Sequence, residues 1–558
     1  MLEKIKKYYH TLKYLKKSQL AYLVKNRLER GKKAVTEAQA PDCRVLPLWL
    51  PDMDAHTDYL KRFCPEDILN GKVELLYETG RPGGPNWANP DKTRLWNFNL
   101  HYLEFLIPLA AAYKRTKDIR YYGCFRYYCG RWEAENKGGT GDGWHPYTIS
   151  LRLTNLWICI DGFKDALLKE PEFFRRLNNS MYAQYLHLQK NPELHLLGNH
   201  YFENLKAVLL GALYFQEPEI YEKYKKKLLG EIKEQILADG VHYERSLMYH
   251  KIILEDLLRV SKAVGETDRS LHRELAEVIG RMADAMYSIE GDMGHTPLFN
   301  DAGDNVAKPF SCLLRALKEE FAVYPSEQEE FSDAGYYCLK NDGLKIVMDA
   351  GRIAPDYMPG HGHCDGLSFE LAHKGRPIFV NSGTGQYQGA LRSYFRSTAA
   401  HNTVVIDGRE QSECWGEHRV SRRISKVSGA CGKNQINGKL TTCFGRRHER
   451  SIGIKDRLVV IRDKVKGHAQ SYLHLAPEYE YVLQGRKILV QRASSRTAAG
   501  TGICEIRTMP SDEIHIHKKG VICSYAPEFG RIQQIQVLEI AWESDGSAHM
   551  IQINFTCS

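Results

Sequence analysis

The sequence has no long hydrophobic run. Nowhere in its 558 residues do apolar side chains approach the roughly 20 consecutive positions that a membrane-spanning helix requires. Residues 1–20 are basic throughout and lack the apolar stretch of a secretory signal peptide. These two absences predict a chain that neither spans a membrane nor is exported, and we therefore expect a cytoplasmic protein.

The sequence also lacks a disulfide framework and a close internal repeat. Its 14 cysteines are scattered without regular spacing. In a chain without an export signal, this distribution is typical of reduced thiols. Cys364 lies within the histidine motif described below and is expected to be a small packed residue rather than a metal ligand.

Outside the N-terminal segment, the chain has no excess of positive or negative charge. The formal net charge is +9, and residues 1–33 alone hold eleven Lys or Arg against two Glu, so the remainder is neutral. Because no nucleic-acid-binding fold is visible either, we expect no nucleic-acid partner. Residues 1–40 carry Leu, Ile, Tyr and Val between the charges, which predicts a basic amphipathic helical segment. Such a segment fits a solvated lid helix lying on the helical domain, and residues 1–33 also fit weak contact with an anionic membrane surface or an acidic polymer.

The length of the chain indicates roughly two or three domains. From about residue 95 to 320, apolar residues recur at three- and four-residue intervals, which predicts helices paired as antiparallel hairpins. After about residue 331, short alternating runs punctuated by Gly, Asn and Asp predict an antiparallel β-sandwich. We place the helical domain at 41–328 and the sandwich at 329–558.

Residues 359–412 carry the strongest chemical signal. They place His361, His363 and His401 among short β-type runs, with Asn381 between them. Imidazoles bind zinc-class ions and transfer protons near neutral pH. Taken alone, a close pair of histidines also fits a buried structural role.

Two elements of this stretch are His361-Gly-His363-Cys-Asp365 and Arg396-Ser-Thr-Ala-Ala-His401-Asn-Thr. Their order and spacing resemble the C-terminal signature of the heparinase II/III-like polysaccharide lyases, and a weaker resemblance extends over roughly residues 45–545. It implies an N-terminal (α/α) toroid of helical hairpins followed by a C-terminal antiparallel β-sandwich, with the cleft between them. It also implies an enzyme that cleaves a uronate-containing, glycosaminoglycan-like polysaccharide by β-elimination, leaving unsaturated uronate ends.

Such a lyase must neutralise the substrate carboxylate, remove the C5 proton and protonate the departing oxygen. The sequence Leu197-Gly-Asn199-His200-Tyr-Phe-Glu203 predicts a helix start that presents Asn199, His200 and Glu203 on one face. The resemblance assigns Asn199 and His200 to the substrate carboxylate. A helix cap followed by a packed histidine is the alternative.

The resemblance assigns the acid and base role to Tyr249, within Glu244-Arg245-Ser-Leu-Met-Tyr249-His250. The spacing of positions 242, 245 and 249 predicts one polar helical face. A tyrosine titrates near 10, so we expect Arg245 and a histidine as cationic neighbours. His361 would reach the cleft from the sandwich as the remaining catalytic group. A core role for Tyr249 is the alternative.

The same resemblance implies that His363, Asn381 and His401 hold one zinc-class divalent ion, Zn or Mn, with a structural role. The family often has Asp in place of Asn381, and a neutral amide oxygen is a weaker ligand.

Further residues are candidates for substrate contact. Gly141–Arg152 offers an aromatic platform and a cation before a helix, and Asn300–Asp304 could meet sugar hydroxyls. The predicted substrate-binding set is Glu203, Arg245, Trp144, His145, Arg152 and Arg396. The loop segments among them fit loop stabilisation equally well.

Two other functions remain open. (α/α) toroids also host glycoside hydrolases, which need two carboxylates, and Glu203 with Asp301 or Asp304 could pair. A non-catalytic polysaccharide-binding or capsule-assembly protein is the third reading. The polymer and the oligomeric state are left open.

Overall fold

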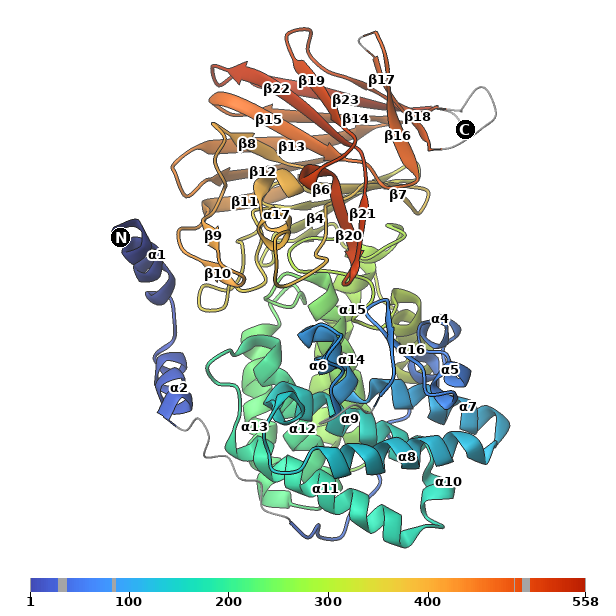
Figure 1. The fold of residues 1–558 in the computed structure, drawn as a ribbon. Coiled ribbons are helices and arrows are strands. Elements are labelled where there is room, and N and C mark those ends of the chain that lie inside the picture. The colour runs from blue at the N-terminus through green and yellow to red at the C-terminus, as the bar shows by residue number, and fades with distance from the viewer. Residues whose placement is uncertain (1, 29–37, 83–86, 486, 494–501, 557–558) are drawn as a thin grey trace.

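The computed structural model describes residues 2–28, 38–82, 87–485, 487–493 and 502–556. Helices fill the N-terminal part and antiparallel sheets the C-terminal part, stacked one on the other (Figure 1). Part of the predicted basic segment, residues 29–37, lies outside the described residues. None of the described helices is long and apolar enough to cross a membrane.

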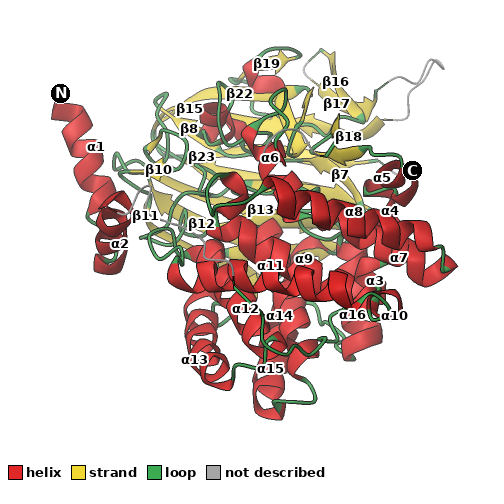
Figure 2. Cartoon of the chain, turned by 60° about the horizontal axis from the view of Figure 1, so that its bottom comes forward, coloured by secondary structure: helices red, strands yellow, loops and turns green. Residues whose placement is uncertain are grey.

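The helical part is built from antiparallel hairpins, as predicted. Adjacent helices pack as pairs, α12 against α13 and α14 against α15, and Figure 2 shows the helices gathered on one side of the sheets. Prolines begin several helices at positions where no backbone donor is needed. The main helices are α6 (Arg94–Tyr102), α7 (Ile107–Thr116), α8 (Ile119–Glu135), α9 (Pro146–Gly162), α11 (Pro171–Lys190), α12 (Gly198–Tyr214), α13 (Pro218–Gln235), α14 (Leu247–Val264), α15 (Arg269–Glu290) and α16 (Phe310–Phe321).

Shorter elements complete the N-terminal part. They are α1 (Leu2–Leu12), α2 (Lys17–Leu28), α3 (Pro51–Asp54), α4 (Thr57–Arg62), α5 (Pro65–Leu69), α10 (Lys164–Leu167) and the hairpin of β1 (Val73–Leu75) and β2 (Glu78–Gly80). The last helix of this part ends at Phe321 and the first strand of the next begins at Glu330. The predicted boundary at 328/329 falls between these two elements.

Three antiparallel sheets form the C-terminal part. Alternating buried and exposed positions, as along β13, direct one face of each sheet into a shared apolar core. The first sheet has the order β3 (Glu330–Phe331), β4 (Tyr336–Asn341), β5 (Leu344–Asp349), β6 (Phe369–His373), β7 (Arg376–Phe379). The second has the order β11 (Ser425–Gly432), β12 (Gln435–Thr441), β13 (Arg447–Lys455), β14 (Leu458–Lys464), β23 (Ala548–Phe555), β18 (Gly502–Arg507), β17 (Lys487–Arg492), β16 (Tyr479–Gln484).

The third sheet and two small hairpins complete the C-terminal part. The sheet has the order β19 (Glu513–His517), β22 (Val537–Ser544), β15 (Gly467–His474), β8 (Val404–Ile406). The hairpins are β9 (Cys414–Trp415) with β10 (Arg419–Val420), and β20 (Ser524–Glu528) with β21 (Arg531–Gln534). A short helix, α17 (Arg392–Phe395), precedes β8.

The two parts are joined beside the start of α14. Leu247 and Ile289 pack in one buried cluster with Phe331 and Val347 of the first sheet. Arg245 donates from Nε to the carbonyl oxygen of Ala334 at 2.8 Å, so its guanidinium fastens the two domains together.

This joint corrects two predictions about Arg245. Its backbone is left-handed, with φ of +55°, and α14 begins only at Leu247. Positions 242, 245 and 249 therefore do not share a helical face. The side chain is buried against Ala334 and Asp333 carbonyls, so Arg245 contacts the sandwich and is unavailable to substrate.

Candidate active site

A cleft of about 700 Å³ lies between the helical domain and the sandwich. Its wall unites all four predicted catalytic residues, although they come from three separate segments of the chain. The lining includes Asn199, His200, Tyr249, His361, Tyr387 and His418.

Asn199 is held at the start of α12 by Glu244. The backbone N–H and the side-chain Nδ2 of Asn199 donate to Oε1 of Glu244 at 2.7 and 3.0 Å. The chain turns sharply here, since Gly198 has φ of +61° and a Cβ at this position would lie 2.6 Å from Glu244 Oε1 and from Met358 Cε. The left-handed backbone favours glycine in this turn, which leads to Asn199 at the cleft wall.

His200 shares a buried carboxylate with a second cleft histidine. Its Nδ1 lies 3.0 Å from Oε1 of Glu193, and Nε2 of His145 lies 3.6 Å from the same oxygen. Burial by itself would lower the pKa of His200, but the negative charges of Glu193, Glu244 and Glu203 raise it above the ordinary value. The site therefore favours a cationic imidazolium facing an anionic ligand.

Tyr249 lies in the first turn of α14, with its hydroxyl 2.7 Å from the hydroxyl of Tyr387. Its ring centroid is 4.4 Å from that of His361. Burial, followed by the nearby phenols and the carboxylates of Glu244 and Asp301, raises the pKa of Tyr249 well above its usual range. The phenol is thus protonated in the free protein. Arg245 is not the cationic neighbour of Tyr249 that was predicted, because its guanidinium is bound to the sandwich.

His361 is oriented by a carboxylate from the helical domain. Its Nδ1 lies 2.9 Å from Oδ2 of Asp301, and its Nε2 lies 3.8 Å from Oε2 of Glu244. Burial would raise the pKa of Asp301, but the Arg392 guanidinium and two histidines hold it well below its usual range. With Nδ1 hydrogen-bonded to a carboxylate anion, Nε2 is the nitrogen left to exchange a proton in the cleft.

Several residues at the site were not assigned these roles from the sequence. Glu193, Glu244, Tyr387, Arg392 and His418 carry no spacing signal, and all except Glu193, which lies seven residues before His200, reach their partners across the fold. Asp301 was noted only within the segment Asn300–Asp304 and as a hydrolase candidate. Its actual partners are His361, His363, Thr384 and Arg392, which lie 60 to 91 residues further along the chain.

Two of the six predicted substrate-binding residues, His145 and Glu203, line the cleft. Glu203 is fully buried and forms an ion pair with Lys206, which also binds Asp256. A hydrolase requires two carboxylates on opposite sides of a bond. The two here share one ammonium group instead.

Trp144 and Arg152 were predicted to contact substrate, but neither lines the cleft. The Trp144 indole donates to the carbonyl oxygen of Asn136 at 2.8 Å. Arg152 is fully buried, donating to the carbonyl oxygens of His101 and Gly143 at 3.0 and 2.7 Å. Both side chains are committed to holding the loop that precedes α9.

Arg396 is also buried and absent from the cleft wall. Its Nε donates to the carbonyl oxygen of Gly362 at 3.0 Å, and its Nη1 to that of Glu417 at 3.2 Å. Its position is explained by bracing of the loop that carries His361, rather than by substrate contact.

The hydrolase pairing suggested by the sequence is wrong on the same grounds. Asp301 is fully buried beneath Arg392 and the histidines, and an Asp304 oxygen accepts from the backbone of Thr296 at 3.0 Å. Neither carboxylate lines the cleft, so Glu203 has no opposite partner among them.

A metal-type cluster lies directly behind His361. Donor atoms of His363, Asp365 and His401 lie within 4.8 Å of one another, and all three side chains are buried. Nδ1 of His363 and both ring nitrogens of His401 have no hydrogen-bond partner. Burial lowers the pKa of His363 to about 4 and that of His401 well below its usual range, so both are neutral, the form that binds metals.

Asp365 is the third donor of this cluster, whereas Asn381 was the third predicted ligand. The Asn381 Oδ1 accepts from the backbone N–H of Asn402 at 3.2 Å, and its Nδ2 has no partner. The described cluster thus holds a carboxylate, Asp365, that was not among the predicted ligands.

The chain matches known proteins over most of its length. A family model described as Heparinase II/III N-terminus matches residues 73–331, and one described as Heparinase II/III-like, C-terminal matches residues 324–540. The heparin-sulfate lyase of Bacteroides thetaiotaomicron is 24% identical over 547 residues, covering 85% of this chain and 74% of that protein. The heparin-sulfate lyase of Pedobacter heparinus is 25% identical over 365 residues, covering 58% of this chain and 54% of that protein.

A solved structure of heparinase III has the same fold. It superposes with a TM-score of 0.69 at 20% identity, covering 96% of this chain and 90% of that one. The likeness confirms the predicted toroid and β-sandwich. Since the two family models follow one another along the chain and meet at the domain joint, the protein belongs to the heparinase II/III-like family and is a polysaccharide lyase.

Proposed function

We propose that this lyase cleaves a uronate-containing, glycosaminoglycan-type polysaccharide by β-elimination. The observation that carries the proposal is the meeting of Asn199, His200 and Tyr249 of the helical domain with His361 of the sandwich in one cleft. The curated relatives are named heparin-sulfate lyases, which supports an acidic polymer as substrate.

The four residues divide the reaction between them. Asn199 and cationic His200 face the uronate carboxylate and stabilise the charge that builds there as the C5 proton leaves. His361, oriented by Asp301, accepts that proton on Nε2. Tyr249, whose raised pKa keeps it protonated, donates to the departing glycosidic oxygen.

The test is a screen of uronate polysaccharides for a new ultraviolet absorbance. Elimination creates an unsaturated uronate that absorbs, whereas hydrolysis does not. Absorbance growing with chain cleavage on a glycosaminoglycan supports the proposal. Cleavage of such a polymer with only saturated ends contradicts it.

The cation of the buried cluster is proposed to be structural. His363, Asp365 and His401 would hold one zinc-class ion, and that ion would brace the loop between His361 and β6. Neutral histidines, a carboxylate and three nitrogens without partners support this assignment.

We expect about one zinc-class ion per chain after dialysis, lost in His363→Ala and His401→Ala. Without the ion, the loop between His361 and β6 should be held less firmly, so the melting temperature should fall and activity should weaken. Elemental analysis and thermal unfolding measure both effects, with exposed His515→Ala as the matched control. Fully active, metal-free wild-type protein with an unchanged melting temperature would contradict the assignment.

Glu193→Gln should shift the alkaline limb of the pH profile of kcat/KM to lower pH. The raised pKa of His200 keeps it cationic over a wider pH range, and loss of the Glu193 charge removes a principal cause of that elevation. The cationic form therefore disappears at lower pH in the variant. Glu172→Gln, at an exposed position on α11, is the control. An unshifted alkaline limb in Glu193→Gln would show that activity does not depend on the charge of His200.

The location and surface contacts are proposals of the same kind. A cytoplasmic location is supported by the free thiols of the described cysteines. Weak contact of the N-terminal helices with an anionic membrane is supported by exposed Ile5, Tyr9 and Val24 beside lysines.

A further inference from the structure

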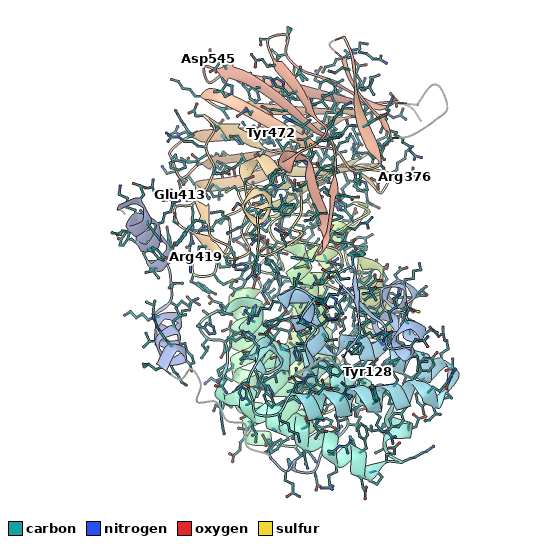
Figure 3. All side chains as sticks on the ribbon, viewed as in Figure 1. Tyr128, Arg376, Glu413, Arg419, Tyr472 and Asp545 are labelled. Carbon is teal, nitrogen blue, oxygen red and sulfur yellow. The ribbon has the colours of Figure 1, made fainter. Side chains whose placement is uncertain are left out.

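Residues 2–28, here named the N-terminal strap, precede both family-matched regions and contact both domains. Figure 1 shows α1 beside the β9–β10 hairpin and α2 beside the helical domain. Figure 3 shows Glu413 and Arg419 on the side of the sandwich that faces α1. The matched family regions begin only at residue 73.

The first anchor of the strap is on the hairpin that carries His418. The Trp415 indole donates to Oγ1 of Thr11 at 3.1 Å, and the Tyr8 ring meets the Trp415 ring edge-on at 4.9 Å between centroids. His418 lies in the turn of this hairpin and lines the cleft, with its ring 6.4 Å from that of His361.

The second anchor is the buried side chain of Gln19, only 2% exposed. Its Oε1 accepts from the backbone N–H of Lys16 at 2.9 Å, which fixes which end of the amide is the donor. Nε2 then donates to the carbonyl oxygen of His195 at 3.4 Å and to that of Tyr357 at 3.2 Å.

These two carbonyls lie in segments that lead to opposite walls of the cleft. His195 lies four residues before Asn199, on the helical side, and Tyr357 lies four residues before His361, on the sandwich side. One amide group therefore ties together the backbones that lead to the carboxylate-binding pair and to the proposed base. Glu234 of α13 reinforces the tie, because it accepts from the Tyr357 hydroxyl at 2.8 Å.

We propose that Gln19 is a positioning residue, and that the N-terminal strap sets the distance between the two walls of the active site. This inference rests on the proposed roles of Asn199 and His361. It predicts that strap contacts affect turnover although no strap residue lines the cleft.

The decisive variant is Gln19→Glu in the full-length chain. It keeps the shape of the side chain but places a carboxylate oxygen against two carbonyl oxygens. A displacement of about 1 Å in an active site can cost about 10²-fold in rate. We expect kcat to fall about tenfold while KM changes less than twofold, because the groups that bind the substrate carboxylate remain in place.

Leu23→Ala is the matched control on the same helix. Its side chain is 44% exposed, so kcat should stay at the wild-type value. Thr11→Val is the second test variant, since it removes the acceptor of the Trp415 indole without changing size. It should lower kcat in the same direction, and it decides the question if Gln19→Glu does not fold.

Hydrogen exchange distinguishes the loss of the strap contacts from an error in the proposed catalytic mechanism. In Gln19→Glu, backbone amides of residues 355–363 should exchange faster than in the wild type and in Leu23→Ala, whatever reaction the cleft performs. Wild-type kcat in both Gln19→Glu and Thr11→Val overturns the proposal. Activity retained by Tyr249→Phe would overturn the proposed mechanism instead, and would leave the exchange result standing.

Discussion

Tyr249→Phe is expected to lower kcat by about 10²–10⁴-fold, the usual cost of a missing acid or base. The variant loses only the phenolic oxygen, whose one described hydrogen bond is to Tyr387. Losing that bond should change the free energy of unfolding by only about 0.5–1.5 kcal/mol. Ultraviolet assay, substrate binding and thermal unfolding together separate lost chemistry from lost structure.

The control for this change is Tyr201→Phe. Tyr201 is another buried tyrosine on the helical side, but it does not line the cleft. It should retain nearly full activity. A Tyr249→Phe enzyme with more than a third of the wild-type rate would remove Tyr249 from the mechanism.

A polymer whose carboxyl groups have been reduced to alcohols should not be cleaved at a measurable rate. A C6 alcohol does not acidify the C5 proton, and it offers no anion to the cationic imidazolium of His200. The charge on the carboxylate grows as the proton leaves. Asn199→Ala should therefore lower kcat more than it weakens binding of the native polymer.

The experiment compares native, mock-treated and carboxyl-reduced samples of one polymer at matched length. Mock treatment controls for chain damage during the reduction. Rates are followed by ultraviolet absorbance and by the size of the products. Cleavage of the reduced polymer at close to the native rate would overturn the β-elimination reading altogether.

The sequence predicts best the features that are local. Helical and alternating periodicities give the order of the two domains, and short motifs bring out His361, His363, His401 and Asn199. Spacing fails at Arg245, where a left-handed backbone breaks the expected helical face. The predicted helical face is wrong because the backbone conformation of this one residue is set by its contacts with the sandwich.

Short motifs do not predict which residues become partners across the fold. An arginine in a sequence predicts a cation, but it does not tell whether carbonyl groups across the fold will surround it. Arg152 and Arg396 were expected to bind substrate, yet both are buried among backbone carbonyls. Conversely, Asp301 becomes central only because the fold brings His361 and Arg392 to it.

The joint at the start of α14 has a mechanical consequence. Tyr249 belongs to the apolar core of the sandwich although its helix belongs to the other domain. If the domains rock, this joint is the pivot, and points near a pivot have a short lever arm. The acid and the base would stay nearly in contact while the distant rim swings widely. A bulky polymer could thus enter and leave without the proton-transfer pair being dismantled in each cycle.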